Sequence, residues 1–221
     1  MSLDQKDFLL SASNYDIPEA IEESSGLQVG DNLIRSILLT TDLSFIQSLN
    51  ADSIMAVHPF EKSAQLDKVI VDFSNRPVFC DIGGGLLYER KTVEAAKKSF
   101  NAGAAAVVIS KPTPAEVISN IRSEIDGPII YTVMFDAETI PELSSAGVDI
   151  FNVATGEYTA ETVSYISSLV PEMPIMASGG PHDSTIRETI RSGANAIVFN
   201  PPTATEILRS FFDEYRDQRS Q

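Results

Sequence analysis

Eight short apolar segments recur along the chain, and their spacing constrains its fold more than any other feature. Successive segments begin roughly 20–27 residues apart, which leaves room for one strand, one helix and two short loops. The segments are 33–39, 53–58, 77–82, 104–110, 128–134, 150–154, 174–178 and 196–200. Because they are rich in Val and Ile, each is predicted to be a buried β-strand.

Proline and glycine mark the borders of these segments. Pro77, Pro128 and Pro174 open three of the odd-numbered segments, and proline is tolerated at the first residue of a strand. Gly103 and Gly147 precede two even-numbered segments, where a glycine typically ends the foregoing helix. The alternation predicts regular strand–helix units.

The stretches between the segments have helical periodicity. Residues 92–101 are predicted to form one helix, because their apolar residues fall on one face. Residues 205–216 are predicted to form the closing helix, with its apolar residues directed inward. These residues are Ile207, Leu208, Phe211 and Phe212.

Continuous apolar strands that alternate with helices are typical of a parallel sheet covered by helices. Eight units in about 190 residues predict an α/β fold, a single (βα)8 TIM barrel over residues 31–221. Residues 1–30 are an N-terminal extension, in which 17–23 are expected to form a short helix over one end of the barrel. The alternative is a doubly wound open sheet, which usually carries a glycine fingerprint after its first strand; none follows residues 33–39.

The charge balance narrows the classes of partner. The chain has 31 acidic and 16 basic residues and a net charge of −15, which disfavours nucleic acids and anionic membranes as partners. No apolar run approaches the ~20 residues that span a bilayer, and the N-terminus lacks the layout of a signal peptide. We therefore expect a soluble, cytoplasmic protein, and a homo-oligomer stays open. Cys80 is the only cysteine, so an intramolecular disulfide is excluded.

Active sites of TIM barrels lie at the carboxyl ends of the strands, so polar residues that end the apolar segments are the candidates. Ser178, Gly179 and Gly180 follow the seventh segment and precede a predicted helix, an arrangement that binds phosphate or carboxylate through backbone N–H groups. The alternative is a tight turn from strand to helix that binds no ligand. Asn200 and Thr203 lie in the matching turn after the eighth segment, where two prolines remove N–H donors.

Five ionisable residues complete the candidate set. Lys111 is a candidate for Schiff-base formation or anion binding, and Asp81 and Glu157 are candidates for moving protons. His58 is a candidate acid or base near neutral pH. Arg35 lies inside an apolar segment, where an unpaired charge is costly, so it is expected to pair with an acid or a ligand anion. For each of these five, a structural or solvated role is the alternative.

Two histidines and one cysteine leave no basis for a metal cluster, and no organic cofactor is indicated. A divalent ion held by Asp81 and a ligand phosphate stays open, because magnesium often uses only one or two protein carboxylates.

Residues 30–215 resemble the phosphate-binding barrels of the ribulose-phosphate type, most closely over 174–180 and 193–200. Within that group, Ile34-Arg35-Ser36, residues 78–86 and Ala177-Ser178-Gly179-Gly180 are similar to the glycerol uptake operon antiterminator regulatory proteins. This resemblance implies a small barrel that senses a glycerol phosphate and binds RNA. The net charge of −15 and the prolines at 201 and 202 depart from that pattern.

Residues 147–150, 155–159 and 174–180 resemble a second group, the N-acetylmannosamine-6-phosphate 2-epimerases and their relatives, which include 2-keto-3-deoxy-6-phosphogluconate aldolases. This resemblance implies isomerase or lyase chemistry on a phosphosugar. The lysine and glutamate of the epimerases have no counterparts here in matching strand contexts, and Lys111 is only an approximate candidate.

Three hypotheses about the function follow from these observations. The first is an isomerase, epimerase or lyase that acts on a sugar phosphate or a carboxylated ligand at the carboxyl end of the barrel. The alternative is a ligand-sensing barrel without catalysis, as the antiterminator resemblance implies. The third is a barrel that has lost most of its site.

Overall fold

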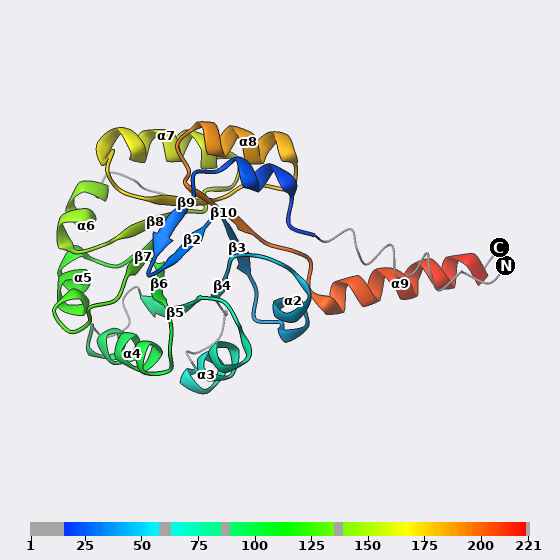
Figure 1. Ribbon diagram of the computed structural model, residues 1–221, viewed down its shortest axis with the longest axis horizontal. Helices are drawn as coiled ribbons and strands as arrows, with labels where there is room; N and C mark the ends of the chain where they lie inside the picture. Colours follow the sequence, from blue (N-terminus) through cyan, green and yellow to red (C-terminus); the bar gives the residue numbers. More distant parts are fainter. Residues whose placement is uncertain (1–15, 58–62, 85–88, 135–138, 220–221) are drawn as a thin grey trace.

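The computed structural model describes residues 16–57, 63–84, 89–134 and 139–219, and its centre is a closed barrel of eight parallel strands (Figure 1). The strands follow one another around the barrel in chain order, and the last pairs with the first. They are β3 (Ser36–Leu39), β4 (Ser53–Ala56), β5 (Val78–Gly84), β6 (Ala106–Lys111), β7 (Ile129–Val133), β8 (Ile150–Val153), β9 (Ile175–Ser178) and β10 (Ala196–Phe199). Each predicted segment overlaps one of them, with β5 and β6 ending one or two residues beyond their segments, so the (βα)8 barrel is confirmed and the open sheet is excluded.

Helices surround the barrel on its outer side (Figure 1). They are α2 (Leu43–Ser48), α3 (Ala64–Phe73), α4 (Glu89–Asn101), α5 (Ala115–Arg122), α6 (Ile140–Ala146), α7 (Thr159–Leu169) and α8 (Asp183–Arg191). The short 3-10 helix η3 (Gly156–Tyr158) precedes α7, and α9 (Ala204–Arg219) follows the last strand. The helix predicted over 92–101 lies within α4. Among the described residues, no helix is both long enough and apolar enough to cross a membrane.

Side chains of the strands alternate between the interior of the barrel and the layer beneath the helices, as the period of two requires. The interior holds Ile37, Met55, Phe79, Val108 and Ile130, which pack in one cluster with other strand residues. The intervening strand residues pack in two outer clusters that also contain helix residues. The apolar segments are continuous because both faces of each strand are buried.

The N-terminal segment covers two parts of the barrel. The 3-10 helix η2 (Glu19–Glu23) packs beside α8, and its Ala20 and Ile21 are buried in an outer cluster. The hairpin of β1 (Leu27–Val29) and β2 (Asn32–Ile34) lies across the amino-terminal end of the barrel (Figure 1), where its apolar residues join the interior cluster. The hairpin, rather than the expected helix, therefore closes this end.

The first apolar segment is thus two elements and not one. Residues 32–34 belong to the hairpin, and the barrel strand begins only at Ser36. The apolar pattern runs through both elements because hairpin and strand face the same interior cluster.

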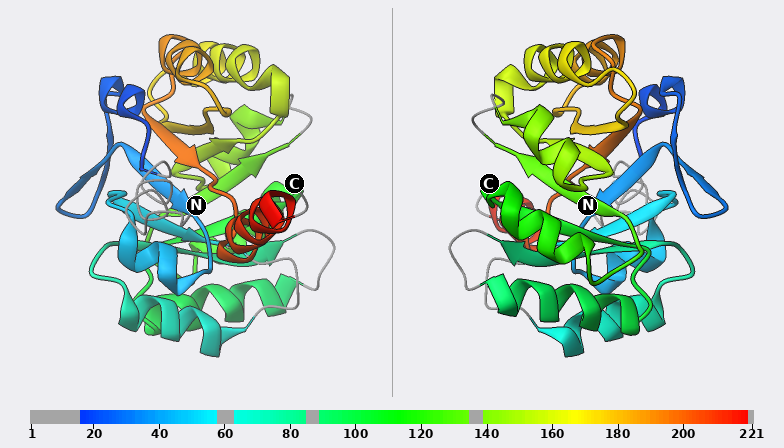
Figure 2. Two further views of the ribbon diagram at one scale, coloured as in Figure 1. Left: turned by 90° about the vertical axis from the view of Figure 1, so that its right-hand side faces the viewer. Right: turned by 90° about the vertical axis from the view of Figure 1, so that its left-hand side faces the viewer.

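The closing helix α9 differs most from its prediction. Its first turn packs on the barrel through Ala204 and Ile207, but the remainder projects away from it (Figures 1 and 2). Leu208 and Phe212 are 51% and 58% exposed, so the prediction that they face inward is wrong. The apolar periodicity located the helix correctly but carried no information on what lies against it.

Candidate functional site

A layer of polar side chains lies inside the barrel near the carboxyl ends of its strands. By strand alternation, each member comes two residues after an apolar interior residue, so it faces the same interior. We call this set the inner polar layer; its members are Asp81, Ser110, Thr132, Asn152 and Ser178. Asp81, Thr132 and Asn152 are buried, and the two serines are half-buried.

Asp81 is held in place by its own turn. Its Oδ1 accepts a hydrogen bond of 2.9 Å from the backbone N–H of Gly83, which lies in the left-handed region with φ +79°. The pairing of β5 with β6 shifts register between Asp81 and Gly84, and the Ser110 hydroxyl donates to the Gly83 carbonyl at 3.4 Å. The irregular end of β5 thereby fixes a buried carboxylate inside the barrel. A carboxylate in this position can transfer a proton or bind a metal ion.

Asn152 has an amide oxygen without a hydrogen-bond partner. Its Nδ2 donates to the Thr132 hydroxyl at 3.2 Å across the β7–β8 pair, while its Oδ1 is buried and accepts no hydrogen bond from the described residues. A buried unsatisfied acceptor costs about 1–3 kcal/mol. A ligand that donates a hydrogen bond here would recover that cost, so Asn152 makes this part of the interior a candidate binding site.

Ser178 ends β9, and the two glycines after it serve different local needs. A Cβ on Gly179 would lie 2.8 Å from side-chain carbons of both Ile186 and Ile197, so glycine permits α8 and β10 to approach. Gly180 has φ +74°, which favours glycine because other residues are strained there. The strand-to-helix turn lies where the sequence predicted it, and binding of an anion by its N–H groups stays a prediction.

The other predicted residues divide between the two ends of the barrel. Glu157 is exposed in η3, which follows β8, and Asn200 is exposed directly after β10, so both lie at the carboxyl end. The backbone of Lys111 ends β6 opposite Gly84, but its side chain and the whole of His58 lie outside the described part of the chain.

Arg35 lies at the opposite end, so its expected place at the mouth of the barrel is wrong. It precedes β3, and its Nε donates to the Ser24 carbonyl at 3.0 Å rather than to an acid. The cause is the hairpin described above: residue 35 begins the barrel strand instead of standing inside it.

Thr203 already has partners for its donors. Its backbone N–H and its hydroxyl donate to Glu206 Oε2 at 2.7 and 2.8 Å, and Glu206 N–H donates back to the hydroxyl at 3.2 Å. These hydrogen bonds, first the one from the backbone N–H, hold the pKa of Glu206 below its ordinary value. This capping box occupies the donors that the predicted anion site would use.

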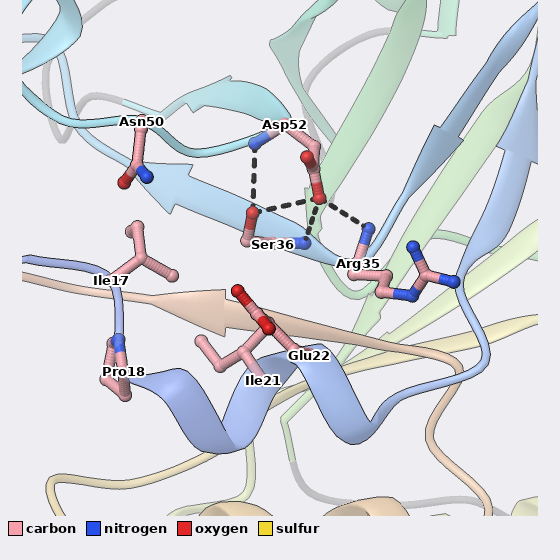
Figure 3. A pocket seen from close by; sticks show the side chains of 8 residues that line it. All are labelled: Ile17, Pro18, Ile21, Glu22, Arg35, Ser36, Asn50 and Asp52. Carbon is pink, nitrogen blue, oxygen red and sulfur yellow. Dashed lines mark hydrogen bonds between the residues drawn. The ribbon is translucent and has the colours of Figure 1, made fainter.

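A cavity of about 360 Å³ lies at the amino-terminal end of the barrel (Figure 3). Asp52 stands in its wall, and its Oδ2 accepts three hydrogen bonds of 2.9 Å from the N–H groups of Arg35 and Ser36 and from the Ser36 hydroxyl. The carboxylate is therefore held by the strand ends, and none of the described residues that line the cavity has a buried polar side-chain atom without a hydrogen-bond partner.

The part of the chain that the structure describes contains no group of three or more His, Cys, Asp or Glu residues that could hold a metal ion. Asp81 fits the role of a single protein ligand to magnesium, which commonly takes its other ligands from substrate and water.

The fold and the inner polar layer define a (βα)8-barrel protein with a candidate ligand site at the carboxyl end of its strands. No protein-family profile matches the chain, and no curated protein matches it. Solved structures do match. A phosphonopyruvate hydrolase in complex with oxalate and Mg²⁺ is 13% identical, with a TM-score of 0.63 over 83% of this chain and 82% of that one.

Two further structures show the same barrel. A putative phosphonomutase from Burkholderia cenocepacia is 15% identical, with a TM-score of 0.65 over 83% of this chain and 92% of that one. A dihydrodipicolinate synthase from Acinetobacter baumannii, complexed with pyruvate, is 17% identical, with a TM-score of 0.59 over 74% and 68%. At these identities the likeness shows the TIM-barrel fold alone, and neither the antiterminator family nor the epimerase group is shown.

Proposed function

We propose that the protein is a barrel enzyme of lyase or isomerase type, which binds a small carboxylated or phosphorylated compound in contact with the inner polar layer. The observation that carries this proposal is the unsatisfied amide oxygen of Asn152, buried beside Thr132 at the carboxyl end of the barrel interior. The interior cluster beneath it, which includes Phe79 and Ile130, is apolar.

Each residue of the layer has a distinct role in this proposal. Asp81 moves a proton at a substrate carbon or holds a divalent ion, because it is the carboxylate of the inner polar layer. Asn152 and Thr132 orient a substrate hydroxyl or carboxylate. The turn at Ser178–Gly180 and Lys111 hold the anionic group, and Glu157 is a second proton carrier.

The class of substrate is supported in two ways. The turn before α8 presents backbone N–H groups at a helix start, which favours anions. Two of the similar structures are complexes with small carboxylates, the phosphonopyruvate hydrolase with oxalate and the dihydrodipicolinate synthase with pyruvate. Sugar phosphates, which the epimerase resemblance implies, stay within the proposal as one of the compound classes to test.

A ligand-sensing barrel without catalysis is the second candidate. The observation that favours it is the exposed apolar face of α9, because a sensor must contact a partner. Ligand binding without turnover would select this candidate.

The experiment is thermal unfolding against a panel of 2-oxo acids, dicarboxylates, sugar phosphates, inorganic phosphate and sulfate, with and without Mg²⁺. A compound at a hundredfold its dissociation constant stabilises by about 2.7 kcal/mol, a shift of roughly 5–10 °C for this length of chain. Compounds that shift the wild type are then assayed for turnover with Asp81→Asn and Lys111→Ala.

Asn152→Leu is expected to abolish the shift. Its matched control is Asn195→Asp, which replaces an asparagine at the other end of the barrel and keeps an acceptor for the Ile175 N–H. If no compound shifts the wild type, or if the shift survives in Asn152→Leu, the proposed site is wrong.

A further inference from the structure

The inner polar layer occupies only part of the circumference of the barrel. Its members stand on the consecutive strands β5 to β9. On β10, β3 and β4, the residues that come two positions after a residue of the interior cluster are Val198, Leu39 and Val57, the last of which directly follows β4. We call these three residues the apolar wall.

The apolar wall lies at about the same depth in the barrel as the inner polar layer. Val198 is buried in the interior cluster, and the half-buried Leu39 and Val57 pack against that cluster. Asn200, the next residue on the same side of β10, is exposed and lies beyond the wall. The interior is therefore polar on one side and apolar on the other at the level of the candidate site.

The order of the strands shows how a ligand would lie between these two sides. In the ring of eight, β5 and β9 are four strands apart, so Asp81 and Ser178 stand on opposite sides of the barrel (Figure 1). Between them, β7 and β8 carry Thr132 and Asn152 on one side, and β10, β3 and β4 carry the apolar wall on the other. A ligand that extends from the turn after β9 to Asp81 would contact both.

The two sides favour different groups on the ligand. Asn152 Oδ1 is a buried acceptor without a partner among the described residues, so the ligand atom beside it must carry a hydrogen, as a hydroxyl does. The side chains of the apolar wall have no polar atoms. A hydroxyl placed there would lose its hydrogen bonds to water, whereas burial of an alkyl group is favourable. A sugar, which carries hydroxyls along its whole length, therefore fits poorly.

The turns at the carboxyl end favour a carboxylate over a phosphate. Phosphate sites of TIM barrels commonly combine the loops after the seventh and eighth strands. After β10, the eighth strand of the barrel, Pro201 and Pro202 have no N–H, and the N–H of Thr203 already donates to Glu206. The turn after β9 is the better donor of the two, and a single turn suits the two oxygens of a carboxylate.

We propose that the site takes a small 2-hydroxy acid that carries an alkyl group, and that the apolar wall determines this specificity. The inference rests on the function proposed above and narrows its substrate class. The carboxylate lies at the turn after β9 and the hydroxyl on Asn152; since β8 and β9 are neighbouring strands, these groups belong on adjacent carbons. The alkyl group packs against Leu39, Val57 and Val198.

The test is isothermal titration calorimetry of the full chain, with Mg²⁺ present, using 2-hydroxy-3-methylbutanoate and 2,3,4-trihydroxybutanoate. The two acids share the carboxylate and the 2-hydroxyl and differ in the group that would face the apolar wall. The wild type is expected to bind the methyl-branched acid at least about tenfold more tightly, because the extra hydroxyls of the other acid would be buried without partners.

Two variants test the apolar wall directly. Leu39→Asn and Val57→Thr add a hydrogen-bonding group at nearly unchanged size, and each should lower the ratio of the two dissociation constants at least about threefold. The matched control is Val69→Thr, which makes the same change at an exposed position on α3 and should leave the ratio unchanged. A ratio is used because a general loss of stability weakens binding of both acids alike.

The outcomes separate this inference from the function on which it rests. Equal binding of the two acids, or a ratio that neither Leu39→Asn nor Val57→Thr changes, would overturn the role of the apolar wall and leave the proposed function intact. The same holds if neither acid binds but a sugar phosphate shifts the thermal unfolding of the wild type. If binding of both acids survives in Asn152→Leu, the proposed site itself is wrong, and the inference falls with it.

Discussion

Two sets of polar residues, one at each end of the barrel, have different uses, although Ser53 at the amino-terminal end also has a buried hydroxyl without a hydrogen-bond partner among the described residues. At the amino-terminal end, Asp52, Asp149 and Asn195 each precede a strand and accept the backbone N–H of the neighbouring strand, at 2.8–2.9 Å. At the carboxyl end, the inner polar layer includes Asn152, whose amide oxygen accepts no hydrogen bond from the described residues. The first set completes the sheet, whereas the second leaves hydrogen-bonding capacity for something that is not part of the chain. This difference agrees with the general division in TIM barrels, in which the amino-terminal end contributes stability and the carboxyl end carries the active site.

The largest effect on stability is expected at the amino-terminal end. Asp52→Ala removes three hydrogen bonds to a carboxylate, so the free energy of unfolding should fall by about 2–3 kcal/mol in a urea titration. Asp72→Ala is the control, because its exposed ion pair with Lys68 is worth at most about 0.5 kcal/mol. Equal losses in both variants would contradict the structural role of Asp52.

The second effect tests whether the glycines of the carboxyl end serve packing or the ligand. Gly179→Ala places a Cβ against Ile186 and Ile197, and we expect it to destabilise the protein by about 1–3 kcal/mol in the same titration. Unchanged stability combined with lost ligand binding would show instead that the glycine admits the ligand.

The third variant tests whether the polar residues at the carboxyl end contribute less to stability than those at the amino-terminal end. Asn152→Leu replaces a buried amide with an unsatisfied oxygen by an apolar group of similar size, but it also removes the hydrogen bond from Nδ2 to the Thr132 hydroxyl. The two effects oppose each other, so the free energy of unfolding should change by less than about 1 kcal/mol. The same variant should lose the ligand-induced thermal shift. A loss of stability as large as that of Asp52→Ala would mean that both ends are equally structural.

The smallest effect concerns the cap of α9. Hydrogen bonds from Thr203 lower the pKa of Glu206 from 4.5, so its contribution to stability is present above that pH and is lost as the pH falls through the lower, folded-state pKa. Glu206→Gln should therefore differ from the wild type near neutral pH, and the difference should shrink in acid. Urea titrations at pH 7 and pH 3 measure it, and a difference that grows at pH 3 would contradict the cap.

The sequence predicted the barrel well because the strands are buried on both faces, which produces continuous runs of Val and Ile. It misplaced Arg35, since a hairpin strand and a barrel strand that pack on the same interior give one uninterrupted apolar pattern. It also misplaced Leu208 and Phe212, because a helical stripe does not reveal what it packs against.

The candidate site was predicted only in part. Asp81 and Ser178 end apolar segments and were found by that rule. Asn152 and Ser110 were not selected, yet a signal for them exists: each lies two residues after an apolar interior residue, such as Ile150 for Asn152. The phase of the strand therefore identifies inward-facing polar residues better than the position where the apolar run stops.

The hairpin at the amino-terminal end has a consequence for folding kinetics. The residues just before the hairpin bind to the segment that precedes β10. The Gly26 N–H donates to the Asn195 carbonyl at 2.7 Å, and Asn195 Nδ2 donates to the Ser25 hydroxyl, 170 residues away in sequence. Contacts so distant in sequence form late, because the loop that they close is long. During synthesis, residues 17–34 must therefore wait for β10, and their apolar side chains stay available to chaperones until the last strand arrives.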